Sequence, residues 1–265
     1  MTTETPGIER VRRHLTLIGA ASLCRFKDRY LERRLQSRCR ARGVADLDAY
    51  ADLLDGDPEE GSRLLSAVAL GVTSFFRNPS AWRSLAHLLT AERRPPSAEC
   101  RAWSAACATG EEAWSLAFLL DGLTREGRLP GWGVDATDLD PRSLGVARHA
   151  EYSDRCLADI EAVITPVAGG QLPGRFVVPM SLRPSVQFSV ADISVPAIRG
   201  PYDIVLCRNV LMYFDFEAQR AVMNVAISAL RIGGLLMLGK AELAPLDLPR
   251  LEWVDRHERI YRRTG

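Results

Sequence analysis

Acidic and amide side chains follow three short apolar runs of the sequence, which span residues 102–106, 132–137 and 202–207. Glu111 follows the first run, Asp138 the second and Asn209 the third. If the runs are neighbouring strands of a parallel sheet, these side chains meet at one edge, because open α/β sheets bind ligands outside the carboxyl ends of their strands. A carboxylate placed like Asp138 accepts both hydroxyls of a ribose. The spacing therefore predicts a site for a ligand that contains a ribose.

The segment after the first run is rich in small residues and differs from a dinucleotide-binding fingerprint. It contains one glycine, Gly110, and the acids Glu111 and Glu112 follow where a pyrophosphate needs bare N–H groups. A cofactor that carries a positive charge fits these acids better. A structural alternative is that Thr109 caps the following helix and that the two acids favour the positive end of that helix.

Two further segments combine aromatic side chains with polar ones. Thr73–Arg77 holds two adjacent phenylalanines beside an arginine, at a domain junction where ligand sites are favoured. The alternative is plain packing between the domains. In Asn209–Asp215, Asn209 is suited to hydrogen-bond a ligand, and Tyr213 lies one turn further on if the backbone is helical. The alternative there is a turn with a core aromatic.

The elements that position these residues divide the chain into two parts. The first seventy residues predict a small all-helical unit, because apolar side chains such as Leu31, Leu35 and Cys39 recur at helical spacing. Beyond them, strands alternate with helices expected at about 111–122, after Pro141 and at 216–230, which indicates a parallel sheet covered on both faces.

The sequence also predicts the structure of three other segments in the second part of the chain. Pro95-Pro96 break the helix that begins near Pro79. Residues 175–190 interrupt the alternation and predict a small antiparallel excursion, and residues 251–262 predict a final pair of strands.

Composition excludes several classes of protein. The chain has 265 residues, 47% hydrophobic, with a formal net charge of +1, which excludes disordered, collagen-like and small disulfide-rich proteins. Six cysteines lack C-x-x-C spacing and four histidines lack metal-ligand spacing, so we expect reduced thiols and no metal. Without a signal-peptide run or an apolar stretch of membrane-spanning length, we expect a cytoplasmic protein with no membrane insertion.

Taken together, the motifs resemble those of a known family. The matching segments are Thr73–Arg77, Trp103–Ala105, Thr109–Glu112, Ala136–Asp140, Cys207–Asp215, Gly233–Leu235 and Leu238–Glu242. They resemble the CheR-type chemotaxis receptor methyltransferases, which transfer a methyl group from S-adenosylmethionine to glutamate side chains of chemoreceptors. The resemblance extends from about Leu15 to the end of the chain.

The resemblance implies an α/β fold. It consists of a Rossmann-like class I S-adenosylmethionine-dependent methyltransferase domain with a small inserted β subdomain, preceded by an all-helical N-terminal domain. The implied boundaries are 1–72 for the helical domain, 73–96 for a linker and 97–265 for the methyltransferase domain, with the β subdomain at about 175–190.

Carried over by position, the resemblance also implies site residues. Cofactor contacts are implied for Thr73, Arg77, Glu111, Asp138, Asp192, Ile193, Asn209 and Val210. Glu111 would lie near the amino-acid or sulfonium end of the cofactor, and Asp138 would hold its ribose. Arg77 and Tyr213 would lie nearest the transferred methyl group and are the candidate catalytic residues. The product would be S-adenosylhomocysteine, and no metal is implied.

Three departures from the family pattern stand out. Gly71 occupies a position that is usually asparagine, which removes one side-chain hydrogen bond to the ligand. Asp192 and Ile193 stand where an asparagine-leucine pair is common, and Asp192 accepts hydrogen bonds but cannot donate them. The stretch 152–175 is short, which bears on docking through the β subdomain.

The small net charge conceals a basic region. Residues 10–42 hold eleven Lys and Arg against Asp28 and Glu32. A solvated helix face explains such a run, and nucleic-acid binding is disfavoured because few aromatic residues are interleaved. With the family resemblance, Arg29, Arg33 and Arg40 become candidate substrate-docking residues for the acidic helical bundle of a chemoreceptor-like cytoplasmic domain, an attraction that salt weakens.

The implied substrate determines the chemistry. A glutamate carboxylate is already ionised at neutral pH, so methyl transfer needs in-line placement and exclusion of water rather than a general base. The sequence leaves two alternatives open. One is a methyltransferase of this fold that acts on another protein or a small carboxylate, since a fold does not determine its substrate. The other is a regulator that binds S-adenosylmethionine without turnover.

Overall fold

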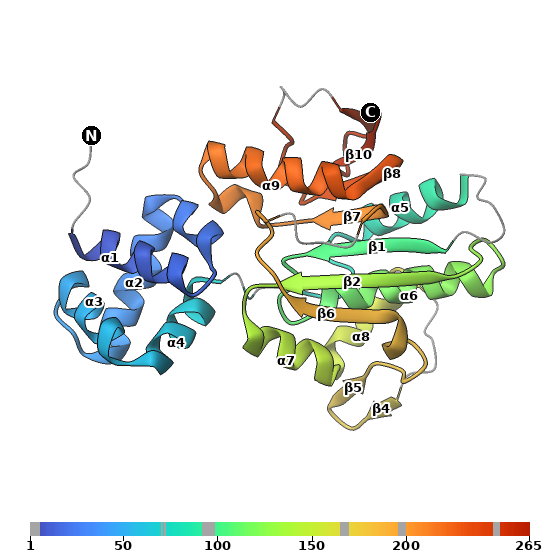
Figure 1. The fold of residues 1–265 in the computed structure, drawn as a ribbon. Coiled ribbons are helices and arrows are strands. Elements are labelled where there is room, and N and C mark those ends of the chain that lie inside the picture. Colours follow the sequence, from blue (N-terminus) through green and yellow to red (C-terminus); the bar gives the residue numbers. More distant parts are fainter. Residues whose placement is uncertain are drawn as a thin grey trace.

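A helical unit and a larger sheet domain lie side by side in the protein, which is described by a computed structural model (Figure 1). The structure describes residues 6–69, 71, 73–91, 99–164, 170–195, 200–245 and 250–265. The helical unit, residues 6–69, is blue to cyan in Figure 1, and the arrowheads of strands β2 (Trp132–Asp138) and β7 (Tyr202–Cys207) point towards it. The carboxyl ends of these strands therefore face the helical unit.

The all-helical character predicted for the first part of the chain is confirmed. Its elements are α1 (Pro6–Leu17), the 3₁₀ helix η1 (Ala21–Arg25), α2 (Asp28–Arg42), α3 (Leu47–Gly56) and α4 (Pro58–Val68). Leu31 and Leu35 are fully buried, as the spacing of α2 predicts. Carboxylates define the starts of α3 and α4, because Asp46 accepts from the N–H of Ala49 at 2.9 Å and Asp57 from that of Glu59 at 3.0 Å.

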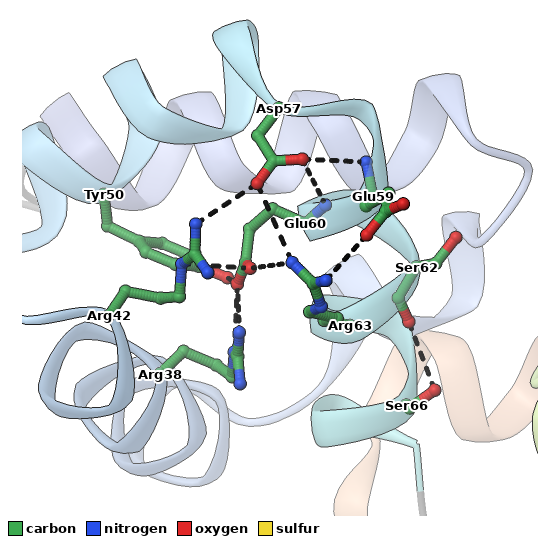
Figure 2. Close-up of polar contacts among 9 residues, drawn as sticks. All are labelled: Arg38, Arg42, Tyr50, Asp57, Glu59, Glu60, Ser62, Arg63 and Ser66. Carbon is green, nitrogen blue, oxygen red and sulfur yellow. Dashed lines mark hydrogen bonds and ion pairs between the residues drawn. The ribbon is translucent and has the colours of Figure 1, made fainter.

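A charged group lies inside the helical unit. The Glu60 cluster is defined as Glu60 with Arg38, Arg42, Tyr50, Asp57 and Arg63 (Figure 2). Glu60 is fully buried, and its Oε1 accepts from Arg38 Nε at 3.0 Å and from the Tyr50 hydroxyl at 2.8 Å. Arg42 Nε lies 3.4 Å from Oε2. One carboxylate therefore connects α2, α3 and α4.

The sheet domain contains a seven-stranded sheet with the strand order β6-β2-β1-β7-β8-β10-β9. Its other strands are β1 (Cys100–Ala105), β6 (Val186–Val190), β8 (Leu230–Leu238), β9 (Leu251–Asp255) and β10 (Ile260–Arg263). Strand β10 is antiparallel to β8 and β9, whereas the pairs from β6 to β8 are parallel. The predicted parallel sheet and the predicted final strand pair are both confirmed.

Helices cover both faces of this sheet. They are α5 (Pro79–Ala91), α6 (Glu111–Arg125), α7 (Pro141–His149), the short α8 (Leu157–Glu161) and α9 (Phe216–Ala229). All residues of β7 are buried. Ile204 and Leu206 pack in the core that contains α5 and α6, on one face of the sheet. Val205 and Cys207 pack in the core that contains α9, on the other face. This two-sided burial explains the uninterrupted apolar run of β7. The Rossmann-like fold class is confirmed.

The small antiparallel sheet predicted at 175–190 lies mostly earlier in the chain, and only residues 175–177 of the predicted span belong to it. The small antiparallel sheet has the order β3-β5-β4 and consists of β3 (Glu151–Ser153), β5 (Arg175–Val177) and β4 (Gly170–Leu172). Val186–Val190 instead forms β6, the parallel edge strand of the main sheet, with Val186 paired to Val134. An edge strand buries little of its surface, and Gln187, Ser189 and Val190 are exposed. Its sequence therefore lacks the apolar run by which the central strands were found.

The segment expected to be a linker is largely structured. Helix α5 occupies most of 73–96, and its Trp82 and Leu85 are buried in the same core as α6. Pro95-Pro96 lie outside the described residues. None of the helices in the described ranges is both long and apolar enough to span a membrane.

Candidate cofactor-binding site

Two adjoining cavities lie where the carboxyl ends of the strands meet the helical unit. The interdomain cavity is lined by Ser22, Leu23, Phe26, Ala69, Ala106, Asp138, Leu139, Ile193, Val210 and Phe214. The linker cavity is lined by Thr73, Ser74, Arg77, Ala106, Cys107, Ala108, Glu112, Arg208, Asn209 and Val210. Both include Ala106 and Val210, so the two cavities are neighbours in one site. The topology therefore brings together most of the residues predicted from the sequence.

The turn after β1 forms the wall shared by both cavities. Ala106 and Ala108 adopt positive φ angles of 57° and 50°, and Gly110 has a φ of 95°. A Cβ on Gly110 would lie 2.6 Å from that of Ala147, so the turn requires glycine there. The proposed Thr109 cap is not present, because its hydroxyl donates to Glu111 Oε2 at 2.6 Å and Gly110 is the N-cap residue. The small side chains leave backbone exposed to a ligand.

Asp138 is held at the end of β2 by backbone groups. Its Oδ2 accepts from the N–H of Ala108 at 2.8 Å and its Oδ1 from that of Asp140 at 2.9 Å. Burial raises the pKa of this carboxyl, which is 7% exposed. Each carboxylate oxygen has a further lone pair, so Asp138 retains acceptor capacity towards the interdomain cavity. Asp140 caps α7 by accepting from the N–H of Arg142 at 3.1 Å.

The two acids after Gly110 have different surroundings. Glu112 lines the linker cavity, accepts from the Ser104 hydroxyl at 2.8 Å and lies 3.3 Å from Arg208 Nη1. Glu111, the predicted cofactor ligand, is absent from the lining of both cavities as far as the described residues show, and its carboxylate bonds to Thr109. Burial raises the pKa of both glutamates. Sequence reasoning noted that both acids suit a positively charged cofactor but missed Glu112 as the one that lines the cavity.

Arg208 is a second residue that sequence reasoning missed. It is 6% exposed, donates to the carbonyl oxygen of Arg77 at 2.7 Å and lies over the Trp82 ring at 5.4 Å. Burial lowers the pKa of its guanidinium, against the opposing effect of Glu112. Arg208 connects the segment after β7 to the linker, and its position directly before Asn209 was the available signal.

Some residues of the segment Thr73–Arg77 are buried in the core, and others line the linker cavity. Phe75 and Phe76 are buried, and the Phe76 N–H donates to the Ser115 hydroxyl at 2.8 Å. Thr73 and Arg77 line the linker cavity. The phenylalanines pack inside the sheet domain rather than between the domains, and only their neighbours face a cavity.

Asn209, Val210 and Tyr213 occupy the turn after β7. Asn209 has a φ of 61°, and both Asn209 and Val210 line the linker cavity. Tyr213 packs against Tyr30 of α2, with ring centroids 4.7 Å apart, and its carbonyl oxygen accepts from the N–H of Lys27 at 2.8 Å. The described lining of either cavity does not include Tyr213. Arg77 and Tyr213, the two candidate catalytic residues, are therefore not on one cavity wall.

Asp192 connects the two parts of the protein. This buried carboxylate accepts from the N–H of Ser22 in η1 at 2.8 Å and from the N–H of Ser194 at 2.9 Å. Ile193, and not Asp192, lines the interdomain cavity. At Gly71, an added Cβ would meet no described atom within 4 Å, so space alone does not explain a glycine there.

The predicted docking residues lie on the exposed side of α2. Arg29, Arg33 and Arg40 are exposed, whereas Arg38 and Arg42 turn inward to the Glu60 cluster. Ion pairs with Arg10, Arg12, Arg25, Arg38 and Arg42 reduce the charge available from the basic region. In the described part of the chain, no group of three or more His, Cys, Asp or Glu side chains is placed to hold a metal ion.

Comparison with known families assigns both parts of the chain. Residues 71–255 match the family described as "CheR methyltransferase, SAM binding domain", and residues 25–69 match "CheR methyltransferase, all-alpha domain". The first match covers more than half of the chain.

Individual relatives agree with these matches. The chemotaxis protein methyltransferase of Escherichia coli is 32% identical over 219 residues, which are 79% of this chain and 74% of the relative. The probable biofilm formation methyltransferase WspC of Pseudomonas putida is 34% identical, over 86% of this chain and 56% of the relative. An uncharacterised 104.1 kDa protein of Rhodobacter capsulatus is 31% identical over 88% of this chain.

The lengths of these relatives differ from that of the chain. It spans 25% of the Rhodobacter capsulatus protein and about half of WspC. The matches in both parts, together with the strand order and the site at the ends of β1, β2 and β7, show that the chain belongs to the CheR methyltransferase family.

Proposed function

We propose that this protein transfers a methyl group from S-adenosylmethionine to glutamate side chains in the cytoplasmic helical bundle of chemoreceptor-like proteins. The observation that carries this proposal is the pair of adjoining cavities, one with the carboxylate of Asp138 and the other with Glu112, Arg208 and Arg77. The name of the Escherichia coli relative supports the chemotactic role. A cytoplasmic location follows from such a substrate.

The residues of the two cavities suit the parts of this cofactor. Asp138 offers acceptors to ribose hydroxyls, and Leu139 and Ile193 offer apolar surface to a purine. In the linker cavity, Glu112 complements an ammonium or sulfonium group. The cofactor would thus lie across both cavities with its amino-acid end towards the linker.

The protein's own part in the reaction is placement. When bound, S-adenosylmethionine supplies a methyl group on a positively charged sulfur, which becomes a neutral thioether as the substrate carboxylate gains the methyl ester. Because that carboxylate is ionised at neutral pH, no side chain has to remove a proton. Arg77, exposed at the mouth of the linker cavity, is suited to orient the incoming carboxylate. Tyr213 packs on Tyr30 of α2 beside the site and lines neither cavity among the described residues.

Docking of the substrate is assigned to the exposed face of α2. Arg29, Arg33 and Arg40 follow one another along this helix, and the ring of Tyr30, which Arg33 covers at 5.6 Å, packs on Tyr213. An acidic bundle held by these arginines would present its glutamates next to the site. Replacing all three by alanine should lower the association rate most at low ionic strength.

The decisive experiment incubates the protein with methyl-labelled S-adenosylmethionine and a chemoreceptor cytoplasmic fragment. We expect label on the fragment that alkali releases, as a glutamyl ester requires. Label that resists alkali, or that appears only on another acceptor, would indicate a different methyltransferase. Cofactor binding measured by calorimetry with no transfer to any fragment would indicate a regulator.

The catalytic residues are tested in the same assay. With cofactor saturating, we expect Arg77→Ala to lower kcat/KM for the receptor fragment by about tenfold or more, and Tyr213→Phe by less. Arg83→Ala, which changes an exposed arginine of α5 outside both cavities, is the matched control and should change nothing. Unchanged kcat/KM in both site variants would contradict the assignment.

A further inference from the structure

One buried carboxylate supports the floor of the linker cavity without lining it. Glu242 follows β8, is 3% exposed and makes its hydrogen bonds to backbone groups. Its Oε2 accepts from the N–H of Asn209 at 2.7 Å and from that of Gly239 at 2.8 Å, and its Oε1 from that of Met212 at 3.3 Å. A single side chain thus holds two turns that are far apart in the sequence.

The turn that Glu242 holds is one that the backbone does not favour by itself. Asn209 has a φ of 61°, in the left-handed region, which asparagine adopts more readily than other side chains but less readily than glycine. One carboxylate accepts from three N–H groups, in one buried and two partly buried hydrogen bonds. The conformation of the Asn209–Tyr213 segment therefore depends on Glu242.

Gly239 shows how closely the two turns approach. A Cβ at this position would lie 2.5 Å from Glu242 Oε2, 2.7 Å from Asn209 Nδ2 and 2.8 Å from the Asn209 nitrogen. Real Cβ atoms do not approach other atoms so closely, so only glycine allows Glu242 to reach Asn209. Glycine and glutamate are thus needed together at this point.

The same turn connects the cavity to the helical unit. Asn209 and Val210 face the linker cavity, and four residues beyond Val210 the backbone of Phe214 pairs with that of Phe26 in an isolated antiparallel bridge. Any shift of this turn therefore moves a cavity wall. Because Glu242 itself contacts neither cavity, its effect on a ligand is indirect.

We propose that Glu242 is a positioning residue for the cofactor, acting through Asn209 and Val210. This inference rests on one part of the proposed function, namely that the cofactor is S-adenosylmethionine. In Glu242→Gln, an NH₂ group replaces one acceptor oxygen and faces an N–H donor, so the turn must shift. We expect the Kd for S-adenosylhomocysteine and the KM for S-adenosylmethionine to rise about tenfold or more, with a smaller change in kcat. The KM for the receptor fragment should stay unchanged.

A control separates positioning from general destabilisation. Asp203 is also a buried carboxylate that accepts a backbone N–H, from Arg101 at 2.8 Å, but it lies at the amino end of β7, opposite the cavities. Asp203→Asn should lower the thermal midpoint like Glu242→Gln while leaving the Kd for S-adenosylhomocysteine within about twofold of wild type. Equal weakening by both variants would overturn the proposal.

The binding experiment uses the full chain and calorimetry with S-adenosylhomocysteine. If the wild-type protein does not bind this ligand, the proposed function fails; if it binds and Glu242→Gln binds equally well, only the present inference fails. Should Glu242→Gln not fold, Gly239→Ala perturbs the same contact from the opposite side, and its Kd must then rise by a similar factor. A folded Gly239→Ala with wild-type affinity would overturn the proposal.

Discussion

The two parts of the protein bury glutamates in opposite ways. In the helical unit, Glu60 is surrounded by the side chains of Arg38, Arg42 and Tyr50, which come from two other helices (Figure 2). In the sheet domain, Glu242 is bound by backbone N–H groups of two turns. The first carboxylate fixes whole helices against one another, and the second fixes the shape of a turn. Removing Glu60 should therefore cost stability, and removing Glu242 should cost ligand affinity.

The largest effect is expected from Glu60→Ala. It leaves the arginines of the cluster and the Tyr50 hydroxyl without their central acceptor, and breaking a buried ion pair in this way costs about 3–5 kcal/mol. The free energy of unfolding in denaturant measures the loss. Glu59→Ala is the matched control, because Glu59 pairs with Arg63 at the surface, where ion pairs contribute about 0–1 kcal/mol. A loss below about 1 kcal/mol for Glu60→Ala would show that its partners find water instead.

An intermediate effect, on affinity, is expected from Asp138→Asn. Asparagine has one acceptor oxygen, so either Ala108 or Asp140 loses the acceptor for its buried N–H. Such a mismatch costs about 1–3 kcal/mol, and we expect the Kd for S-adenosylhomocysteine to rise about ten- to a hundredfold. Calorimetry measures it. Asp135→Asn, in the same strand but away from the cavities, should leave the Kd unchanged; equal Kd values for the two variants would contradict the role of Asp138.

The smallest effect concerns the contact between the two parts. Arg25 binds Asp215 at 2.6 Å, and this hydrogen bond lowers the pKa of the Asp215 carboxyl. The contribution of Asp215 to stability is therefore fully present above the ordinary aspartate pKa of about 3.9 and is lost as the pH falls through the lowered folded-state pKa. Asp138, with its raised pKa, contributes with the opposite sign.

Asp215→Asn tests this pH dependence without removing the helix cap, because asparagine also caps α9 well. The unfolding free energy of wild type should exceed that of the variant slightly at neutral pH, and the difference should vanish in acid. Since both side chains are more than one-third exposed, salt should reduce the difference as well. A difference that persists at low pH would mean that charge is not its cause.

Much of the fold was predictable because it depends on local patterns. The face of α2 follows from the spacing of Leu31 and Leu35, and the central strand β7 from its uninterrupted apolar residues. The edge strand β6 was not predictable in this way, because half-exposed residues such as Phe188 are compatible with several kinds of strand. A central strand that is buried on both faces has an uninterrupted apolar sequence. A partly exposed edge strand has no such run and is harder to recognise.

The site was predictable at the level of segments and less so at the level of single residues. Glu111 and Glu112 are adjacent on a helix and point about 100° apart, so choosing between them requires the position of the neighbouring strand. Glu60 has partners 10 and 22 residues away in the sequence, and the partners of Glu242 are backbone groups that carry no residue identity. No sequence pattern records such contacts.

The helical unit contributes part of the wall of the interdomain cavity, which affects how independent the two units are. Ser22, Leu23 and Phe26 of the helical unit line this cavity, and Asp192 holds Ser22 from the sheet domain. A chimera that exchanges residues 6–69 for those of a relative would also exchange Ser22, Leu23 and Phe26, which form part of the cavity wall. A change made in the helical unit would therefore also alter the binding cavity, so the two units are not structurally independent modules.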